Sequence, residues 1–370
     1  MKRRFASMLL VVFLFLLLPV FTAFGATSND MPEQHSQDED MVDVNLFLAF
    51  IPSVQFAPVY MAIENGYFEE EGIDITLEYS FNEIDGIDRL AINNLQFGIV
   101  SGDQVILARG AEKPLVYVME WYHRFPVGVV VPADSDIESP EDLEGKVVGL
   151  PSFGGASYIG LKALLDDAGL DESDLLLQPI GFTAPELMCA EQIDAAVVYI
   201  VNEPLTIADD CFDVRVIEVS DYANLISNGL VTNEETIEDH PELVESMVRA
   251  IVRGIIDTIN DPETALDVSV VEIPDLPEEE YDTQYQILLN SIELWRSDHP
   301  GETNAEAWEL THQVLLDLEL LEDPVDDLEA AYSNEFVPEM EMDADMGEDE
   351  AMDEDMDAEG ETDSESATEE

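Results

Sequence analysis

The chain has 370 residues, of which 84 are Asp or Glu and 13 are Lys or Arg, so its formal net charge is −71. This balance excludes nonspecific binding of nucleic acid, because such binding needs basic side chains against the phosphates. The acidic residues are spread along the whole chain, which suggests a high-salt habitat where ions screen the self-repulsion.

The N-terminus carries the pattern of an export signal. Three basic residues at positions 2–4 precede an apolar run over 5–24, and small residues surround a cleavage point near Ala26. We predict a signal peptide over residues 1–26; an uncleaved anchor is the alternative, since the run is about long enough to span a bilayer. The mature protein is expected to be exported and soluble, in the periplasm or at the extracellular face of the cytoplasmic membrane.

Two acidic segments flank the part of the chain that can form a core. Residues 27–41 form a polar leader, and residues 338–370 form a tail without Lys, Arg or aromatic residues. Neither segment can bury enough apolar surface to fold, so both are predicted to be disordered. A metal-buffering tail is less favoured, because the acidic residues lack the spacing of an EF-hand loop. An adhesive surface role for the tail is a further, weaker alternative.

The segment 46–79 predicts a strand, a loop, a helix, a turn and a second strand. Leu46–Phe50 is an apolar run typical of a buried strand, and Pro58 suits an early helical position. The second strand is expected over Ile73–Tyr79. In such a βαβ unit, the loop after the first strand faces a ligand crevice, which makes Gln55 and Tyr60 candidate ligand contacts.

This segment also carries a family resemblance. The stretch FAPVYMAIENGYFEEEGIDITLEY resembles the opening of the NMT1/THI5-like (SsuA/THI5) solute-binding proteins, and LQFGIVSGDQ and IDAAVVYIVNEP resemble later segments of that family. The resemblance covers about residues 42–337. It implies an α/β fold of the type II periplasmic binding protein kind, with two lobes, two hinge crossings and a ligand cleft between the lobes.

The remaining elements are expected to build these lobes. We predict lobe 1 over residues 42–131 plus 225–337 and lobe 2 over residues 132–224. Pro126 and Pro132 bracket a strand before the crossing. Strands are expected over 97–100, 115–121, 127–131, 146–150, 175–182, 193–199, 214–218 and 230–232. Helices are expected over 84–93, 104–109, 241–260, 262–267, 279–295 and 304–318, with a further helix starting at Ser139–Asp142.

Polar and aromatic residues at strand ends are the candidate site. Ser101 precedes a helix and offers its hydroxyl and backbone N–H to a ligand; capping that helix is the alternative role. Trp121 and Tyr122 lie in an aromatic link and would stack on a flat heterocycle, unless they form a core cluster. Tyr199, Asn202 and Glu203 follow a buried strand; Glu203 either accepts hydrogen bonds from a heterocycle or starts a helix.

A glycine-containing turn gives the last candidates, Ser152, Gly154, Gly155 and Tyr158. It resembles the anion-holding loop of the family, where a helix N-terminus offers free N–H groups, although a purely structural turn is the alternative.

The two cysteines, Cys189 and Cys211, lie 22 residues apart in the sequence. A disulfide and two buried thiols are both compatible with this spacing. Neither a CxxC pair nor a Cys/His cluster is present, so no metal site is expected.

Function follows from the resemblance and from what the motifs exclude. No nucleophile elbow, zinc-protease motif or P-loop occurs, so an enzyme is not expected, and no cofactor is predicted. The resemblance implies a monomeric substrate-binding protein that delivers its ligand to an ABC permease and its ATPase, and that meets the membrane only through the permease. A thiamine-pyrimidine precursor is the first expected ligand and riboflavin the second. Sulfonates, taurine or nitrate come third. An anionic ligand would need a basic residue in the cleft, and Arg124 is the one basic residue near the aromatic link.

Overall fold

The computed structural model describes residues 41–274 and 276–339. The predicted signal peptide, the leader before Met41 and the tail from Met340 lie outside the described residues. Within the described part, no helix combines the length and the apolarity needed to cross a membrane.

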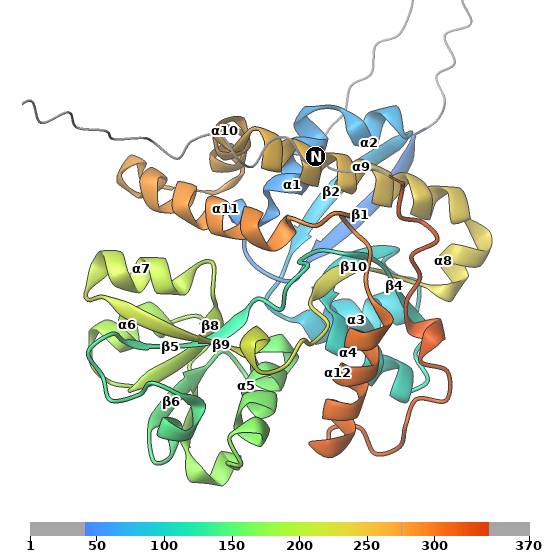
Figure 1. Ribbon diagram of the computed structural model, residues 1–370. Coiled ribbons are helices and arrows are strands. Elements are labelled where there is room, and N and C mark those ends of the chain that lie inside the picture. The colour runs from blue at the N-terminus through green and yellow to red at the C-terminus, as the bar shows by residue number, and fades with distance from the viewer. Residues whose placement is uncertain (1–40, 275, 340–370) are drawn as a thin grey trace, which may run out of the picture. The chain divides into compact units, whose positions relative to one another are not determined.

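Two five-stranded mixed sheets form the framework (Figure 1). The first sheet has the order β2-β1-β3-β10-β4, in which β10 runs antiparallel to both neighbours. Its strands are β1 Val42–Leu48, β2 Ile73–Tyr79, β3 Phe97–Ser101, β4 Leu115–Glu120 and β10 Asn228–Asn233. The second has the order β7-β6-β8-β5-β9. Its strands are β5 Val127–Pro132, β6 Val147–Leu150, β7 Leu176–Pro179, β8 Ala195–Tyr199 and β9 Val214–Glu218.

Helices cover both faces of the first sheet, because its strands alternate buried side chains between two hydrophobic clusters. Leu46 and Leu48 belong to one cluster with α1, α9 and α11, whereas Phe47 belongs to the other with α3, α4 and α12. The helices associated with this sheet are α1 Ala57–Glu64, α2 Tyr67–Glu70, α3 Glu83–Ala91, α4 Gly102–Gly110, α8 Glu234–Asp239, α9 Pro241–Asn260, α10 Pro262–Glu272, α11 Tyr281–Trp295 and α12 Ala305–Asp317.

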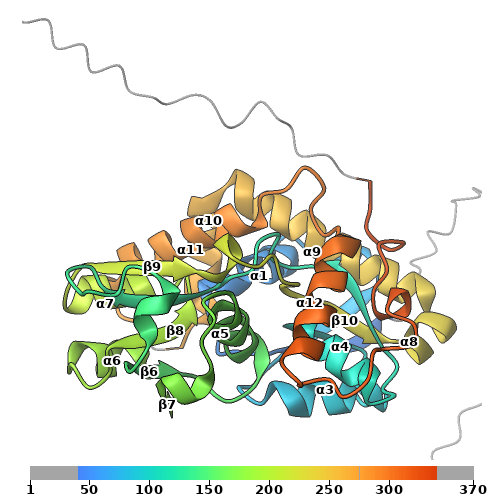
Figure 2. The same cartoon turned by 60° about the horizontal axis from the view of Figure 1, so that its bottom comes forward.

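The second sheet carries three helices: α5 Gly155–Asp167, α6 Ala184–Cys189 and α7 Glu203–Asp210. Helix α5 packs against β5 and β8 (Figure 2). A disulfide joins Cys189, the last residue of α6, to Cys211 directly after α7, with the two Cα atoms 5.6 Å apart. The structure therefore selects the disulfide from the two alternatives that the sequence left open.

The first lobe boundary expected from the sequence is wrong by one strand. We predicted residues 127–131 in lobe 1, but β5 lies in the second sheet between β8 and β9. All of its residues before Pro132 are buried, so it fits the middle of either sheet by composition alone. The crossing between the sheets is therefore the link 121–126, and the return crossing runs over 219–227.

Three expected elements differ in extent. The helix expected at Ser139 is a single 3₁₀ turn over Pro140–Leu143, because Gly145 follows with a φ of 75° and turns the chain. The strand expected over 175–182 ends at Pro179, which cannot donate to a ladder. Helix α10 runs on to Glu272, beyond the expected end at Asp267.

Helix α9 lies unusually close to α1. A Cβ atom built on Gly254 would lie 2.0 Å from the carbonyl oxygen of Pro58, so only glycine allows this approach. The close contact fixes the helix that begins after the loop of Gln55 and thereby positions one wall of the site.

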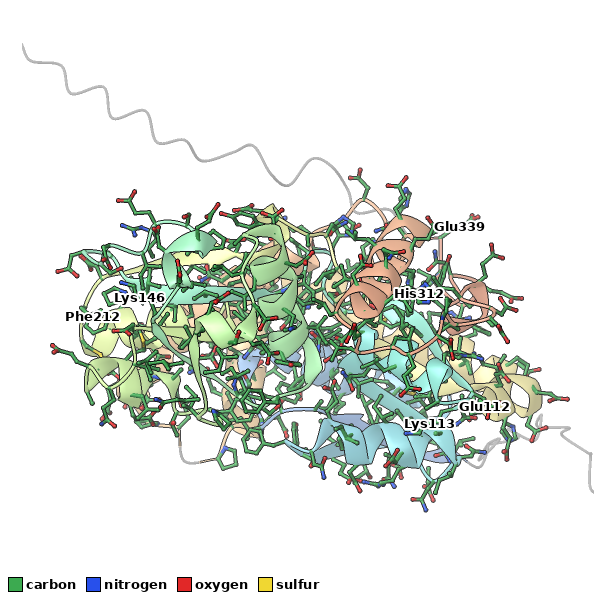
Figure 3. All side chains as sticks on the ribbon, turned by 90° about the horizontal axis from the view of Figure 1, so that it is seen from below. Glu112, Lys113, Lys146, Phe212, His312 and Glu339 are labelled. Atoms are coloured by element: carbon green, nitrogen blue, oxygen red, sulfur yellow. A yellow bond between two sulfur atoms is a disulfide. The ribbon has the colours of Figure 1, made fainter. Side chains whose placement is uncertain are left out.

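Basic residues on the surface pair with the abundant acids. Lys113 lies 2.6 Å from Asp88 and Lys146 lies 2.7 Å from Asp136; both lysines are labelled in Figure 3. Exposed pairs of this kind each contribute little to stability, and salt screens them further.

Candidate functional site: a cavity between the strand ends

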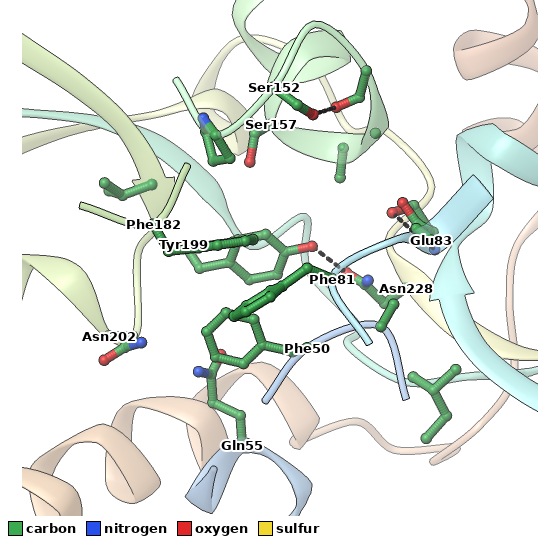
Figure 4. Close-up of a pocket in the computed structure, with 18 of the residues that line it drawn as sticks. Phe50, Gln55, Phe81, Glu83, Ser152, Ser157, Phe182, Tyr199, Asn202 and Asn228 are labelled. Carbon is green, nitrogen blue, oxygen red and sulfur yellow. Dashed lines mark hydrogen bonds between the residues drawn. The ribbon is translucent and has the colours of Figure 1, made fainter. Parts of the chain in front are cut away.

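A cavity of about 500 Å³ lies where the strands of both sheets end. Phe50, Phe81 and Ser101 come from the ends of β1, β2 and β3, while Ser152 and Tyr199 come from the ends of β6 and β8. The carboxyl ends of parallel strands are where ligands bind in open α/β sheets. Figure 4 shows Phe50, Phe81, Ser152 and Tyr199 converging on one space.

The structure brings ten of the twelve predicted site residues to this cavity. They are Gln55, Ser101, Trp121, Tyr122, Ser152, Gly154, Gly155, Tyr199, Asn202 and Glu203.

The other two, Tyr60 and Tyr158, do not line the cavity. Tyr60 is 1 % exposed and lies in the hydrophobic cluster formed with α9 and α11, where its hydroxyl is 3.0 Å from that of Tyr79. The Tyr158 hydroxyl donates to Glu172. The Tyr158 ring packs edge-on against Phe153, with ring centroids 5.9 Å apart, and so lies behind a residue that does line the cavity.

Several lining residues were missed from the sequence. Phe50, Phe81 and Phe182 each follow a strand closely, so the strand-end rule that selected Tyr199 would also have selected them. Glu83 and Asn228 carry no such signal, because the first starts a helix and the second starts a strand. Their place at the cavity depends on how α3 and β10 pack.

Trp121 and Tyr122 belong to a core cluster and also line the cavity, which are the two alternatives that the sequence left open. Trp121 is 2 % exposed and packs edge-on against Trp295, with ring centroids 5.8 Å apart, while Tyr122 stacks on the same indole at 5.9 Å. The two residues therefore form a core cluster whose remaining edge lines the cavity.

The polar groups of the cavity differ in whether they already form hydrogen bonds within the protein. The Tyr199 hydroxyl donates to the Asn228 side-chain oxygen at 3.1 Å, as Figure 4 shows. The Ser152 hydroxyl donates to the carbonyl of Gly154 at 3.1 Å. Both hydroxyl protons therefore already have an acceptor, whereas the Asn202 side chain makes no hydrogen bond to another described residue.

Two carboxyl groups line the cavity. Oε1 of Glu83 accepts hydrogen bonds from the backbone N–H and the hydroxyl of Ser101, the latter at 2.7 Å. Burial raises the pKa of Glu83, although these bonds oppose the rise. Oε2 of Glu203 is buried and has no hydrogen-bond partner among the described residues. Burial raises the pKa of Glu203 from 4.5 to about 7.

Cationic side chains are missing from the described lining, which contains no Lys, Arg or His. Arg124 lies 3.6 Å from Glu218 and is not part of the lining. A bound anion would therefore face two carboxyl groups without a compensating cation. The cavity instead offers aromatic rings, amides and acceptor oxygens, which suit a flat ligand with N–H or O–H donors.

Comparison with known protein families identifies the family of this chain. A family model described as NMT1/THI5 like matches residues 53–265, more than half of the chain. The chain belongs to the NMT1/THI5-like family. The expected fold, with two lobes and a cleft, is confirmed by solved structures of binding proteins that match it.

Two relatives of the NMT1/THI5-like chain are binding proteins. It is 34 % identical to the riboflavin-binding protein RibY of Chloroflexus aurantiacus, covering 86 % of this chain and 93 % of that one. It is 30 % identical to the formylaminopyrimidine-binding protein of Halalkalibacterium halodurans, covering 78 % and 89 % respectively. A 4-amino-5-hydroxymethyl-2-methylpyrimidine phosphate synthase of Legionella pneumophila is 24 % identical over 63 % of this chain and 74 % of its own.

Among solved structures, the aliphatic sulphonate binding protein SsuA of Escherichia coli matches with a TM-score of 0.64 and 17 % identity, over 78 % of this chain and 91 % of that one. The nitrate-binding protein NrtA of Synechocystis PCC 6803 matches with a TM-score of 0.59 and 10 % identity, over 80 % and 87 %. At these identities the matches concern the fold alone.

Proposed function

We propose that the protein is the extracytoplasmic binding component of an ABC importer and that it carries a flat nitrogen heterocycle, with riboflavin as the first candidate. The observation that carries this proposal is the aromatic cavity of about 500 Å³, whose described lining holds two carboxyl groups and no cation. The two binding-protein relatives, named for riboflavin and for formylaminopyrimidine, support the same class of ligand.

The size of the cavity favours riboflavin over the thiamine-pyrimidine precursor that the sequence placed first. Ligand cavities enclose most of their ligand, and a single pyrimidine ring would leave much of this volume to water. An isoalloxazine with its ribityl chain uses more of it. The pyrimidine remains the second candidate, because it shares the flat ring and the donor groups.

Sulfonates, taurine and nitrate fit the site less well. The N-terminus of α5 brings backbone N–H groups to the cavity, but an anion taken out of water there would face the carboxyl groups of Glu83 and Glu203 with no cation in the described lining. The unpaired Oε2 of Glu203 would instead accept a hydrogen bond from a ring N–H or an amino group.

Binding without chemistry is the activity we assign. The relatives named as binding proteins match more of this chain, at higher identity, than the synthases do. In this proposal the exported monomer closes on its ligand by hinge motion at the links 121–126 and 219–227, and then delivers it to a permease and its ATPase.

A ligand-induced thermal shift in molar salt tests the proposal, with riboflavin, an aminopyrimidine, taurine and nitrate as the panel. A ligand at 100 times its dissociation constant stabilises the fold by about 2.7 kcal/mol, which a melting curve resolves. We expect a shift with riboflavin and no shift with taurine or nitrate. A shift with an anion alone would refute the assigned ligand class.

A further inference from the structure

Two phenyl rings from different sheets stack on each other at the cavity. Phe81 follows β2 of the first sheet and Phe182 follows β7 of the second. Their ring centroids are 4.4 Å apart and their planes differ by 24°. Phe50 approaches both rings edge-on, at 5.9 Å from Phe81 and 5.3 Å from Phe182. Figure 4 shows the three rings beside Tyr199.

This stack is not part of any of the three buried hydrophobic clusters. Phe81 is 54 % exposed and Phe182 is 42 % exposed, and neither belongs to a buried cluster in the described structure. Folding of the separate sheets therefore does not explain the contact. Each ring has apolar area left over, and both rings line the same cavity.

A neighbouring phenylalanine provides a contrast. Phe153 also lines the cavity and is 55 % exposed, but its aromatic partner is Tyr158, from the same sheet's helix α5. It therefore has the same exposure and chemistry as Phe81 without an aromatic partner across the cavity.

We propose that Phe81 and Phe182 are specificity-determining residues that sandwich a planar ligand between their rings. This inference rests on the proposed function and specifies how the site selects a flat ring. Aromatic rings stack at about 3.5 Å, so a ligand between them needs centroids about 7 Å apart. Insertion therefore requires the two strand ends to separate by about 3 Å, a displacement that rotation at the two hinge links supplies.

The rest of the cavity is arranged to complete such a complex. Stacked rings hold a planar molecule by its faces and leave its edges free. The amide of Asn202 and the unpaired Oε2 of Glu203 line the same cavity and offer hydrogen bonds to those edges. A tetrahedral sulfonate has no flat face to place between the rings, so the sandwich rejects it by shape.

A simple latch is the competing explanation of the stack. If the two rings only held the lobes together without touching ligand, their loss would make opening easier and would leave affinity unchanged or raise it. The sandwich predicts the opposite sign, because each ring contributes stacking to the bound state. The direction of the affinity change therefore separates the two explanations.

The test is a titration of the mature protein with riboflavin, using Phe81→Leu, Phe182→Leu and the control Tyr281→Leu, which replaces an exposed aromatic ring at the start of α11, outside the cavity lining. Leucine keeps apolar bulk at these exposed positions, and melting temperatures confirm that each variant is folded. We expect affinity to fall about threefold to tenfold in the first two variants, to stay within twofold in the control, and to be restored by Phe182→Tyr.

The outcomes separate the two proposals. Affinity that is unchanged or higher in both Phe81→Leu and Phe182→Leu, while wild type binds riboflavin, overturns the sandwich and leaves the proposed function in place. An equal loss in Tyr281→Leu also overturns it, because the loss would then not depend on a ring at the cavity. Wild-type protein that binds neither riboflavin nor 4-amino-5-hydroxymethyl-2-methylpyrimidine overturns the proposed function and the sandwich together.

Discussion

The carboxyl of Glu203, whose buried Oε2 has no hydrogen-bond partner among the described residues, predicts a pH dependence of stability that a single substitution removes. Burial raises its pKa from 4.5 to about 7 in the folded protein. The folded state therefore favours the protonated form. Stability from this group is fully present below about pH 4.5 and is lost as pH rises through about 7. Glu203→Gln keeps the size of the side chain and cannot ionise, so this loss disappears.

The magnitude follows from the two pKa values. The interval from 4.5 to about 7, at 1.36 kcal/mol per pH unit, corresponds to about 3 kcal/mol. We expect Glu203→Gln to match the wild type near pH 4.5 and to exceed its free energy of unfolding by up to about 3 kcal/mol at pH 8. Most other titrating groups are common to both proteins and cancel in the difference.

Urea denaturation in molar salt, at intervals from pH 4.5 to 8.5, measures this difference. The control is Glu64→Gln, which removes one charge from an exposed position on α1. The control is expected to follow the wild type at all pH values. A constant difference between Glu203→Gln and wild type across the range would refute the argument, because a buried carboxyl with a raised pKa cannot give a pH-independent effect.

Three further predictions concern binding and packing. Trp121→Ala should weaken riboflavin binding by 1 kcal/mol or more, roughly the stacking scale, as measured by calorimetric titration; unchanged affinity would remove Trp121 from the site. Gly254→Ala should lower the free energy of unfolding by about 1–3 kcal/mol in urea, since its methyl group would meet the Pro58 carbonyl. Replacing Cys189 and Cys211 by Ser should cost about 3 kcal/mol, because the bond closes a loop of about 22 residues; a melting temperature equal to that of the oxidised wild type would contradict this.

Local sequence patterns predicted most of the elements and most of the candidate residues that line the cavity. The first strand and helix were predicted from the apolar run before Pro52, the proline at position 58 and the turn at Asn65-Gly66. Each of these features sets the conformation of the backbone at its own position, so no distant contact is needed. The rule that ligands bind at strand ends then selected Tyr199 and Ser101 without knowledge of the packing. Both line the cavity.

Side-chain direction could not be read from those patterns. Tyr60 lies in the segment that resembles the family most strongly, yet the rotation of α1 against α9 turns its ring into the core. That rotation depends on the close approach at Gly254, far away in the sequence. Tyr158 likewise has a partner that the pattern did not indicate, since its hydroxyl donates to Glu172.

What the sequence by itself determined was the alternation of strands and helices, the family and the strand ends that line the cavity, because these depend on neighbours along the chain. Tertiary structure decided which sheet receives β5, since a fully buried strand fits either sheet by composition. It also decided that Phe81 and Phe182, about a hundred residues apart, stack across the cavity. That contact exists only where two sheets meet, and no local pattern encodes a meeting of distant strand ends.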